Sequence, residues 1–274
     1  MAYHRPVKPF HRQHPVRGYL NDPRIGRESR SFHFGVDISA PDGTPVFAVE
    51  PGTAFAQQRH VTVLQAGPRR LFGYWHIVPV VRDGQAVAAR ELLGHIVASK
   101  GHVHFAEKSG ERYRNPLRPG ALTPYEDHTA PGIDGIVFLQ GGTAVPPDDL
   151  RGRVDVVVDA FDTPPRQVPP PFADMPVTPA RLRWRILRSG RIVVPYRTVI
   201  DSRKAHLTPE HYDDVFAQGT RQNRPNRPGR YRYLTARAFD TRTLPDGDYR
   251  FQVEASDTHG NRILSGVAFT IANA

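Results

Sequence analysis

The chain contains no cysteine among its 274 residues. This absence excludes disulfides, thiolate metal sites and a cysteine nucleophile together. The sequence also lacks any apolar run near the roughly 18 residues of a membrane-spanning helix, and its start is basic and polar, unlike a secretory signal. We therefore expect no integral membrane segment and no export leader. The compartment stays open, because a cysteine-free chain tolerates oxidising and reducing surroundings alike.

Proline and glycine are plentiful instead, with 27 and 23 residues. Between Phe32 and Leu117, short apolar runs alternate with turn signals such as Pro41-Asp42-Gly43 and Arg82-Asp83-Gly84. This pattern is typical of short strands joined by tight turns, and it predicts a mainly antiparallel β domain. A chain of this length favours two domains over one. The expected parts are an extended N-terminal arm over residues 1–30, a first domain over 14–118, a linker over 119–131 and a second domain over 132–274.

The second half has strand patterns of its own. Arg181 to Ile186 alternates arginine with apolar residues, and Tyr249 to Ala255 repeats that period of two. Such alternation places one face of a strand in a core and the other in water. We therefore predict an immunoglobulin-like β-sandwich. It is interrupted by an insertion over residues 201–228, with a short helix expected within 209–216.

The formal charge of +10 is concentrated in the first half of the chain. Residues 1–120 hold 17 Lys+Arg against 9 Asp+Glu, whereas residues 121–274 hold 20 against 18. A positive field favours encounter with nucleic acid, anionic lipid or an anionic cell wall, without choosing among them. The basic cluster Arg221, Arg224, Arg227, Arg230 and Arg232 could recognise phosphate or form a solvated loop. Because no nucleic-acid motif accompanies it, we expect no nucleic-acid partner.

Histidines gather in the first half. In His102-Val103-His104 the two imidazoles lie two residues apart, so on a strand both point to the same face. The pair alone is a weak indication, because an H-x-H pattern is not rare among 13 histidines. It indicates either a shared metal site or two partly exposed strand residues.

Two further pieces add a carboxylate and another imidazole. His33 and Asp37 are four residues apart, too far on a straight strand to reach one ion unless the backbone bends, and Gly35 is where a bend costs least. The third piece is Tyr74-Trp75-His76. Two histidines and one carboxylate are typical ligands of catalytic zinc, which keeps its fourth position for water.

In order and local wording, these segments resemble the lysostaphin-like or LytM-type zinc endopeptidases that cut peptidoglycan. The resemblance covers about residues 14–118 and predicts the duplicated-hybrid-motif type of fold for the first domain. It rests on His33-Phe34-Gly35-Val36-Asp37, Asp42-Gly43-Thr44-Pro45-Val46, Tyr74-Trp75-His76, His102-Val103-His104-Phe105, Ser109-Gly110 and Asn115-Pro116. Relatives often place a glutamate directly after the His-x-His-Phe motif. Here Ala106 intervenes before Glu107, which leaves the cleaved bond more open than the metal.

The resemblance implies one Zn2+ per chain, with His33, Asp37 and His104 as its ligands. It also implies that His102 and His76 are the catalytic histidines that are not ligands, that peptidoglycan is the substrate, and that the enzyme works outside the cytoplasm. His60 and His95 match no motif position and are expected to be structural or exposed. The alternatives are a catalytically silent wall-binding protein or an activator of other wall hydrolases. An N-terminal arm carrying His4, His11, His14 and Asn21 could also occupy the open metal position.

Overall fold

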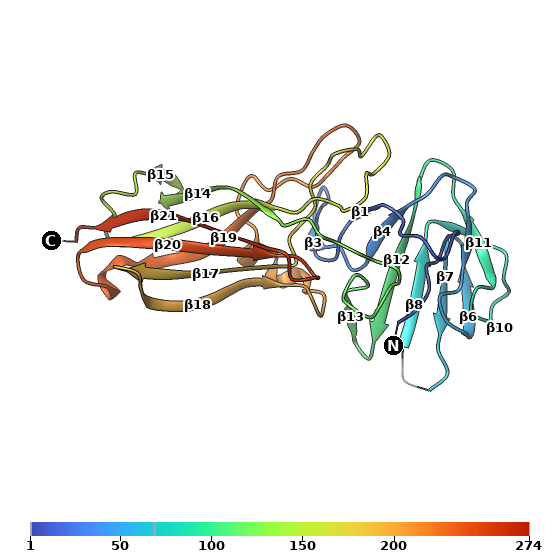
Figure 1. Cartoon of the computed structure of the whole chain (residues 1–274). Helices are drawn as coiled ribbons and strands as arrows, with labels where there is room; N and C mark the ends of the chain where they lie inside the picture. The colour runs from blue at the N-terminus through green and yellow to red at the C-terminus, as the bar shows by residue number, and fades with distance from the viewer. Residues whose placement is uncertain (1, 68–69, 274) are drawn as a thin grey trace.

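The computed structural model describes residues 2–67 and 70–273 and shows two β-rich parts that lie end to end (Figure 1). Every strand pair among the described residues is antiparallel, apart from isolated bridges such as Tyr3 with Leu122. The prediction of a mainly antiparallel β protein is therefore confirmed. Among the described residues, no helix combines the length and the apolar character needed to cross a membrane.

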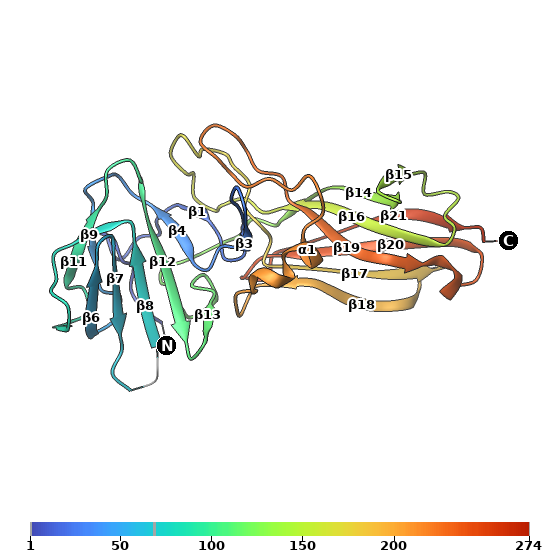
Figure 2. The same cartoon turned by 180° about the vertical axis from the view of Figure 1, so that it is seen from behind.

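The first part is built on an eight-stranded sheet in the order β1-β4-β12-β8-β7-β6-β10, with β13 paired to β12. Figure 2 shows β12 from behind, between β4 and β8. The strands are β1 (Val16–Gly18), β4 (Val36–Ser39), β6 (Gly52–Gln57), β7 (His60–Leu64), β8 (Arg70–Trp75), β10 (Gln85–Val87), β12 (His102–Ser109) and β13 (Arg112–Arg114).

Two smaller sheets complete the first part. One contains β5 (Pro45–Phe47), β11 (Leu92–Ile96) and β9 (Ile77–Pro79), and the other is the ribbon of β2 (Pro23–Ile25) and β3 (Arg30–Phe32). Residues of the large sheet and of the three-stranded sheet share one hydrophobic core, which includes Phe105, Tyr74 and Leu93. The first six residues of β12 are all buried, because this strand is paired on both sides and covered on its apolar face. Its polar residues therefore lie in a protected environment.

The second part contains two four-stranded sheets whose inner faces share a second core. One sheet has the order β15-β14-β16-β19, and the other β18-β17-β20-β21. The bounds are β14 (Gly132–Gln140), β15 (Thr143–Val145), β16 (Arg153–Phe161), β17 (Arg181–Arg188), β18 (Arg191–Asp201), β19 (Arg232–Asp240), β20 (Gly247–Ser256) and β21 (Arg262–Ile271). On β17 the alternation is as expected, with Leu182, Trp184 and Ile186 buried. The immunoglobulin-like assignment stays a prediction.

Helices are short. The helix expected within 209–216 is confirmed as the 3-10 turn η1 (Pro209–His211) followed by α1 (Tyr212–Val215), and a second 3-10 turn, η2, spans Thr241–Thr243. Tyr212 and Val215 are buried in the second core. The apolar face of α1 thus anchors part of the insertion.

The two parts interlock at their junction. Phe32, at the end of β3, is 2% exposed and packs in the second core, while Val177 from the second half packs in the first core. The N–H of Leu207 donates to Oδ1 of Asn21 at 2.9 Å. The N–H and hydroxyl of Thr178 both donate to Oδ1 of Asp22, at 3.0 and 2.7 Å. Buried apolar and polar contacts therefore fix the second half against the segment that precedes His33.

Candidate metal centre and active site

The pairing of β4 with β12 brings the first two candidate ligands together. In this register Asp37 lies opposite His104, and Ser39 lies opposite His102. Directly opposed residues on neighbouring antiparallel strands point their side chains to the same face. Asp37, His104 and His102 therefore converge on one face of the sheet.

His33 joins them because the chain bends between β3 and β4. Residues 33–35 belong to neither strand, and Gly35 lies in the bend that the sequence predicts. A Cβ at Gly35 would lie 2.4 Å from the Phe105 carbonyl oxygen and 2.8 Å from Nε2 of His104. Only glycine allows the bend to pack this closely against β12.

Three ligand atoms meet at the centre of this cluster. His33 Nε2 lies 2.7 Å from His104 Nδ1 and 3.2 Å from Asp37 Oδ1, and His104 Nδ1 lies 3.1 Å from the same oxygen. Two bonds of about 2.0–2.1 Å at a tetrahedral angle place donor atoms about 3.3 Å apart. The donor set and its spacing therefore fit one metal ion.

The protonation states also suit a metal centre. Burial lowers the pKa of His33 to about 3, and the nearby Arg24 charge acts in the same direction, so this imidazole is neutral near pH 7. Its Nδ1–H donates to the Tyr19 carbonyl oxygen at 2.9 Å, which leaves Nε2 unprotonated, with a lone pair that can bind a metal. Burial alone would raise the pKa of Asp37, but His33 and His104 outweigh it and lower that pKa well below its usual range. A neutral His33 imidazole beside the Asp37 carboxylate is in the form that a metal ligand requires.

The two other predicted histidines lie beside the three ligand atoms. His102 Nε2 is 3.5 Å from Asp37 Oδ1, and its Nδ1 lies 2.7 Å from the Lys100 carbonyl oxygen. His76 follows β8, and its ring centre lies 4.7 Å from that of His102. Its φ of 65° is the left-handed region, an uncommon conformation for a histidine and one that often marks a functional position. Burial lowers the pKa of His76 to about 4 and also lowers the pKa of His102.

An open groove exposes this cluster. A cleft of about 610 Å³ is lined by all five predicted site residues, which are His33, Asp37, His76, His102 and His104. A second cleft of about 740 Å³ continues past His76 and His102 and shares Arg17 and Phe172 with the first. The five polar residues therefore lie along one groove that extends to both sides of them.

The second half of the chain forms the opposite wall of this groove. Its residues there include Phe172, Gln222, Asn223, Pro225 and Tyr231. Most of them lie on residues 163–176 and 217–230, which we call the covering loops; they rise beside β1 and β3 in Figure 1. The Arg17 guanidinium lies 4.2 Å from the centre of the Phe172 ring, so a cation–π contact ties the first loop to the groove floor.

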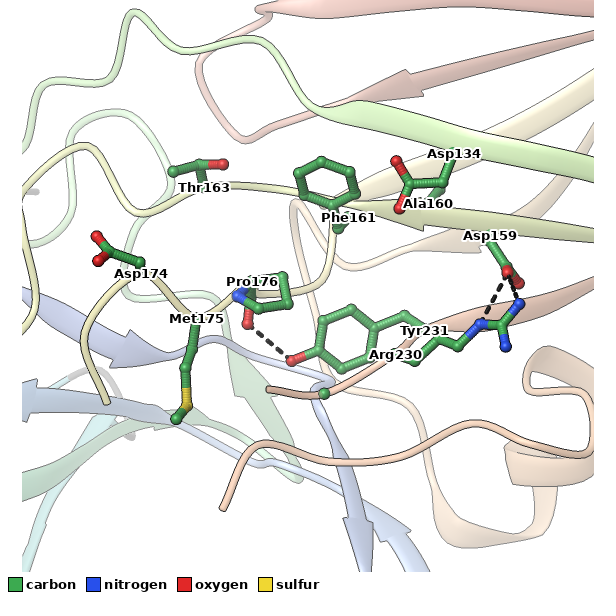
Figure 3. A pocket seen from close by; sticks show the side chains of 11 residues that line it. Asp134, Asp159, Ala160, Phe161, Thr163, Asp174, Met175, Pro176, Arg230 and Tyr231 are labelled. Atoms are coloured by element: carbon green, nitrogen blue, oxygen red, sulfur yellow. Dashed lines mark hydrogen bonds and ion pairs between the residues drawn. The ribbon is translucent and has the colours of Figure 1, made fainter. Parts of the chain in front are cut away.

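The base of the covering loops is fixed by hydrogen bonds. Figure 3 shows Tyr231 reaching the Pro176 carbonyl oxygen, to which its hydroxyl donates at 2.9 Å. Asn223 Nδ2 donates to the same oxygen at 2.6 Å. A smaller cavity of about 230 Å³ lies beside Tyr231 and Met175 (Figure 3). The two loops are therefore attached to each other where they approach the groove.

The N-terminal arm contacts the cluster through arginine rather than through its histidines or Asn21. Arg24 Nη2 lies 3.1 Å from Asp37 Oδ2, the oxygen that faces away from His33 and His104. Arg17 Nη2 lies 2.7 Å from His102 Nδ1. Asn21, named above as a possible occupant of the open position, instead accepts from Leu207 at the junction. The arm therefore contributes positive charge around the ligand set.

The residues on the groove floor were predicted from the sequence, whereas the residues on its opposite wall were not. Phe172, Gln222 and Tyr231 carry no motif, and nothing in the sequence connects them with a site about 70–190 residues earlier. Arg17 and Arg24 were missed for the same reason. His60 stacks on Trp75 at 5.5 Å, and His95 lies on β11, so neither lines the two clefts.

Comparison with solved structures gives partial matches. The catalytic domain of the antimicrobial peptidase lysostaphin from Staphylococcus simulans is 22% identical, with 36% of this chain and 86% of that chain covered and a TM-score of 0.32. The catalytic domain of the prophage-encoded M23 protein EnpA from Enterococcus faecalis is 25% identical, with 38% of this chain and 88% of that chain covered and a TM-score of 0.30. Helicobacter pylori Csd3 is 19% identical, with 46% of this chain and 36% of that chain covered and a TM-score of 0.36. The match therefore spans about a third of the length of Csd3. No curated protein sequence matches the chain.

Residues 31–116 match peptidase family M23. The matched segment contains His33, Asp37, His76, His102 and His104, and it confirms the resemblance drawn from the sequence motifs. Over residues 31–116, the first part of this chain therefore matches peptidase family M23.

Proposed function

We propose that the chain is a zinc-dependent endopeptidase that hydrolyses peptide bonds in the stems or cross-bridges of bacterial peptidoglycan. One observation carries the proposal: His33 Nε2, Asp37 Oδ1 and His104 Nδ1 lie within 2.7–3.2 Å of one another on the floor of an open groove, with two more imidazoles beside them. Nitrogen and carboxylate donors that leave one coordination position open are typical of catalytic zinc.

The ligands in this proposal are His33, Asp37 and His104, which hold one Zn2+. Zinc held there would polarise the scissile carbonyl and lower the pKa of the attacking water. The Tyr19 carbonyl orients the His33 ring, and Arg24 holds the outer oxygen of Asp37 so that the inner one faces the histidines. Such contacts to the ligands set their orientation and protonation.

In this proposal His102 accepts a proton, and His76 stabilises negative charge. In the tautomer that keeps its proton on Nδ1, beside the Lys100 carbonyl, His102 carries the lone pair on Nε2 and can accept the proton of the attacking water. His76 lies across the groove floor from His102, where its ring N–H can donate to the oxyanion of the tetrahedral intermediate. Both imidazoles have lowered pKa values, so both are neutral at the start of the reaction.

The shape and charge of the groove support a polymeric substrate. The two clefts run past the histidines in both directions, so peptide on either side of the cut bond can be bound. The first half, which carries most of the net positive charge, favours encounter with an anionic wall. A substrate in the wall places the enzyme outside the cytoplasm, and we propose the periplasm, the cell wall or the medium as its place of action.

The test combines zinc content with turbidity loss of purified peptidoglycan. We expect the wild-type chain to bind one Zn2+ and to clear the wall, and a chelator to stop it. His102→Ala should keep its zinc and lose activity by about 10²–10⁴-fold, the usual contribution of a general base. A chain that binds zinc but clears no wall type would favour a regulator of other hydrolases. A chain that binds no zinc would overturn the proposal.

A further inference from the structure

Three buried aspartates meet at the junction, away from the histidine cluster. Asp127 lies in the segment between the two parts, Asp162 directly follows β16, and Asp257 directly follows β20. They are 4%, 1% and 2% exposed. One carboxylate oxygen from each lies within 4.8 Å of those of the other two. Segments far apart in the sequence therefore place three acidic groups in one buried spot.

Among the described residues only neutral groups donate to these carboxylates, including the Asn261 side-chain amide to Asp257 Oδ2 at 2.6 Å and the Tyr125 hydroxyl to Asp127 Oδ2 at 3.4 Å. Asp257 Oδ1 accepts from the N–H groups of residues 259–261, and Asp127 Oδ1 accepts from the Thr129 N–H at 2.9 Å. Asp162 Oδ1 accepts from the Thr163 N–H at 2.8 Å. Its Oδ2 is buried and has no hydrogen-bond partner among the described residues. A buried carboxylate oxygen without a partner is costly, so it indicates a ligand that completes the site.

No arginine or lysine of the described residues forms an ion pair with any of the three. The titratable groups that face Asp162 and Asp127 are Asp22, Asp257, Tyr19, Tyr125, Tyr233 and His259. Burial raises the pKa of Asp162 to about 8, helped by the charges of Asp127 and Asp257. Three carboxylates this close and this dry must take up either protons or a cation.

We propose that Asp127, Asp162 and Asp257 form a calcium site that ties the linker to the second half of the chain. An all-oxygen ligand set suits a hard cation, and oxygens that lie within 4.8 Å of one another are near enough to share one Ca2+ at bonds of about 2.3–2.6 Å. Magnesium requires bonds of about 2.0–2.1 Å and keeps several waters, which suits a dry cluster less well. The site is separate from the histidine cluster and does not depend on the proposed peptidase activity.

The position of Asp162 gives this site a structural consequence. The N–H of Asp162 donates to the Val177 carbonyl at 2.7 Å, and the N–H of Val177 donates back at 2.9 Å, which closes the base of the covering loop 163–176. Asn261, beside Asp257, donates to the Asp127 carbonyl at 2.8 Å. A cation bound by the three carboxylates would therefore hold the linker, the β20–β21 turn and the base of one groove wall together.

The experiment uses the full chain, stripped of metal and then given one equivalent of zinc. Calcium binding is measured by titration calorimetry and thermal unfolding, and mass spectrometry counts zinc and calcium separately. We expect one Ca2+ per chain and a rise in melting temperature of about 5 °C or more at calcium 100-fold above its dissociation constant. Because the two metals are counted independently, a missing zinc and a missing calcium cannot be confused.

Asp162→Asn should abolish calcium binding. It should also raise the melting temperature of the calcium-free chain at pH 7, because asparagine is neutral without the proton that the buried Asp162 must take up on folding. Asp127→Asn is the second variant should the first fail to fold, and the exposed Asp134→Asn is the matched control that keeps the calcium response. The proposal is overturned if wild type binds no calcium at about 10 mM, tenfold above the weakest dissociation constants of extracellular calcium modules. A wild-type chain whose stability falls from pH 5 to pH 8 and ignores calcium would show that the cluster holds a proton instead.

Discussion

His104 Nδ1 lies 3.1 Å from Asp37 Oδ1, although 67 residues separate them in the chain. The distance follows from the register of β4 with β12, which places the two residues directly opposite each other. A slip of β4 by one residue would turn Asp37 to the opposite face of the sheet from His104. The site therefore depends on the pairing of two strands as much as on its side chains.

Replacing either of these residues should remove the metal. We expect Asp37→Asn and His104→Ala to lower zinc affinity by at least about 100-fold, because loss of a direct ligand costs more than loss of a group that orients one. Equilibrium zinc binding with a competing chelator measures this, and circular dichroism checks the fold. His95→Ala, on β11 outside the groove, should bind zinc as wild type does. Equal zinc content in all three variants would contradict the ligand assignment.

Gly35→Ala tests the close packing of the bend. A methyl group there would meet the Phe105 carbonyl oxygen at 2.4 Å, and backbone cannot move aside as a flexible side chain can. We expect a loss of about 1–3 kcal/mol in the free energy of unfolding, typical of overpacking, together with weaker zinc binding as His104 is displaced. Urea unfolding measures the first and chelator competition the second. Gly135→Ala has no atom within 4 Å of the added carbon and serves as the control; an equal loss there would mean that packing at residue 35 is unimportant.

The groove floor was predictable from sequence because its information is local. The His102-x-His104 spacing fixes two side chains on one face of a strand, and the need for a bend at Gly35 follows from strand length alone. The partner of each strand is set by burial in the finished core, so the opposition of Asp37 and His104 could be expected only through the family resemblance.

The other groove wall was not predictable in this way. Phe172 and Gln222 reach the groove because Phe32 and Val177 each pack into the core of the other half. Such contacts depend on how two folded parts fit together, which leaves no periodic trace in the sequence. The three aspartates of the proposed calcium site were missed for the same reason, since each looks like an ordinary turn residue.

Glu107 lies one position later than the glutamate of the family pattern, and the structure shows what its side chain contacts. It is 1% exposed, and its carboxylate accepts from Arg118, Arg70 and the Tyr3 hydroxyl. Burial raises its pKa, but the hydrogen bond and charge of Arg118 outweigh burial, and the pKa is lowered overall. A lowered carboxyl pKa stabilises the fold above the unfolded value of about 4.5, and this stability is lost as pH falls through the folded value.

Glu107→Gln should therefore cost about 3 kcal/mol at pH 7, because two buried arginine contacts lose their charge partner. The difference from wild type should shrink below pH 4.5, where the wild-type carboxyl gains its proton. Urea unfolding at several pH values measures both effects. Glu111→Gln is the control, since its side chain is 93% exposed and forms a surface ion pair with Lys108. A difference that stays constant down to pH 3 would show that shape, rather than charge, makes Glu107 important.

Phe172→Ala tests whether the second half of the chain takes part in substrate binding. Phe172 lines both clefts and contacts Arg17, and it is not one of the three ligand residues. Removing an aromatic wall residue should cost about 1.4 kcal/mol of binding, or tenfold in KM, with kcat within about threefold and zinc content unchanged. Phe55→Ala, on β6 and 39% exposed, should leave both constants at wild-type values. Steady-state kinetics on a soluble cross-bridge peptide measures both constants. An unchanged KM would mean that the covering loop does not contact substrate. A large fall in kcat alone would place Phe172 in the chemical step.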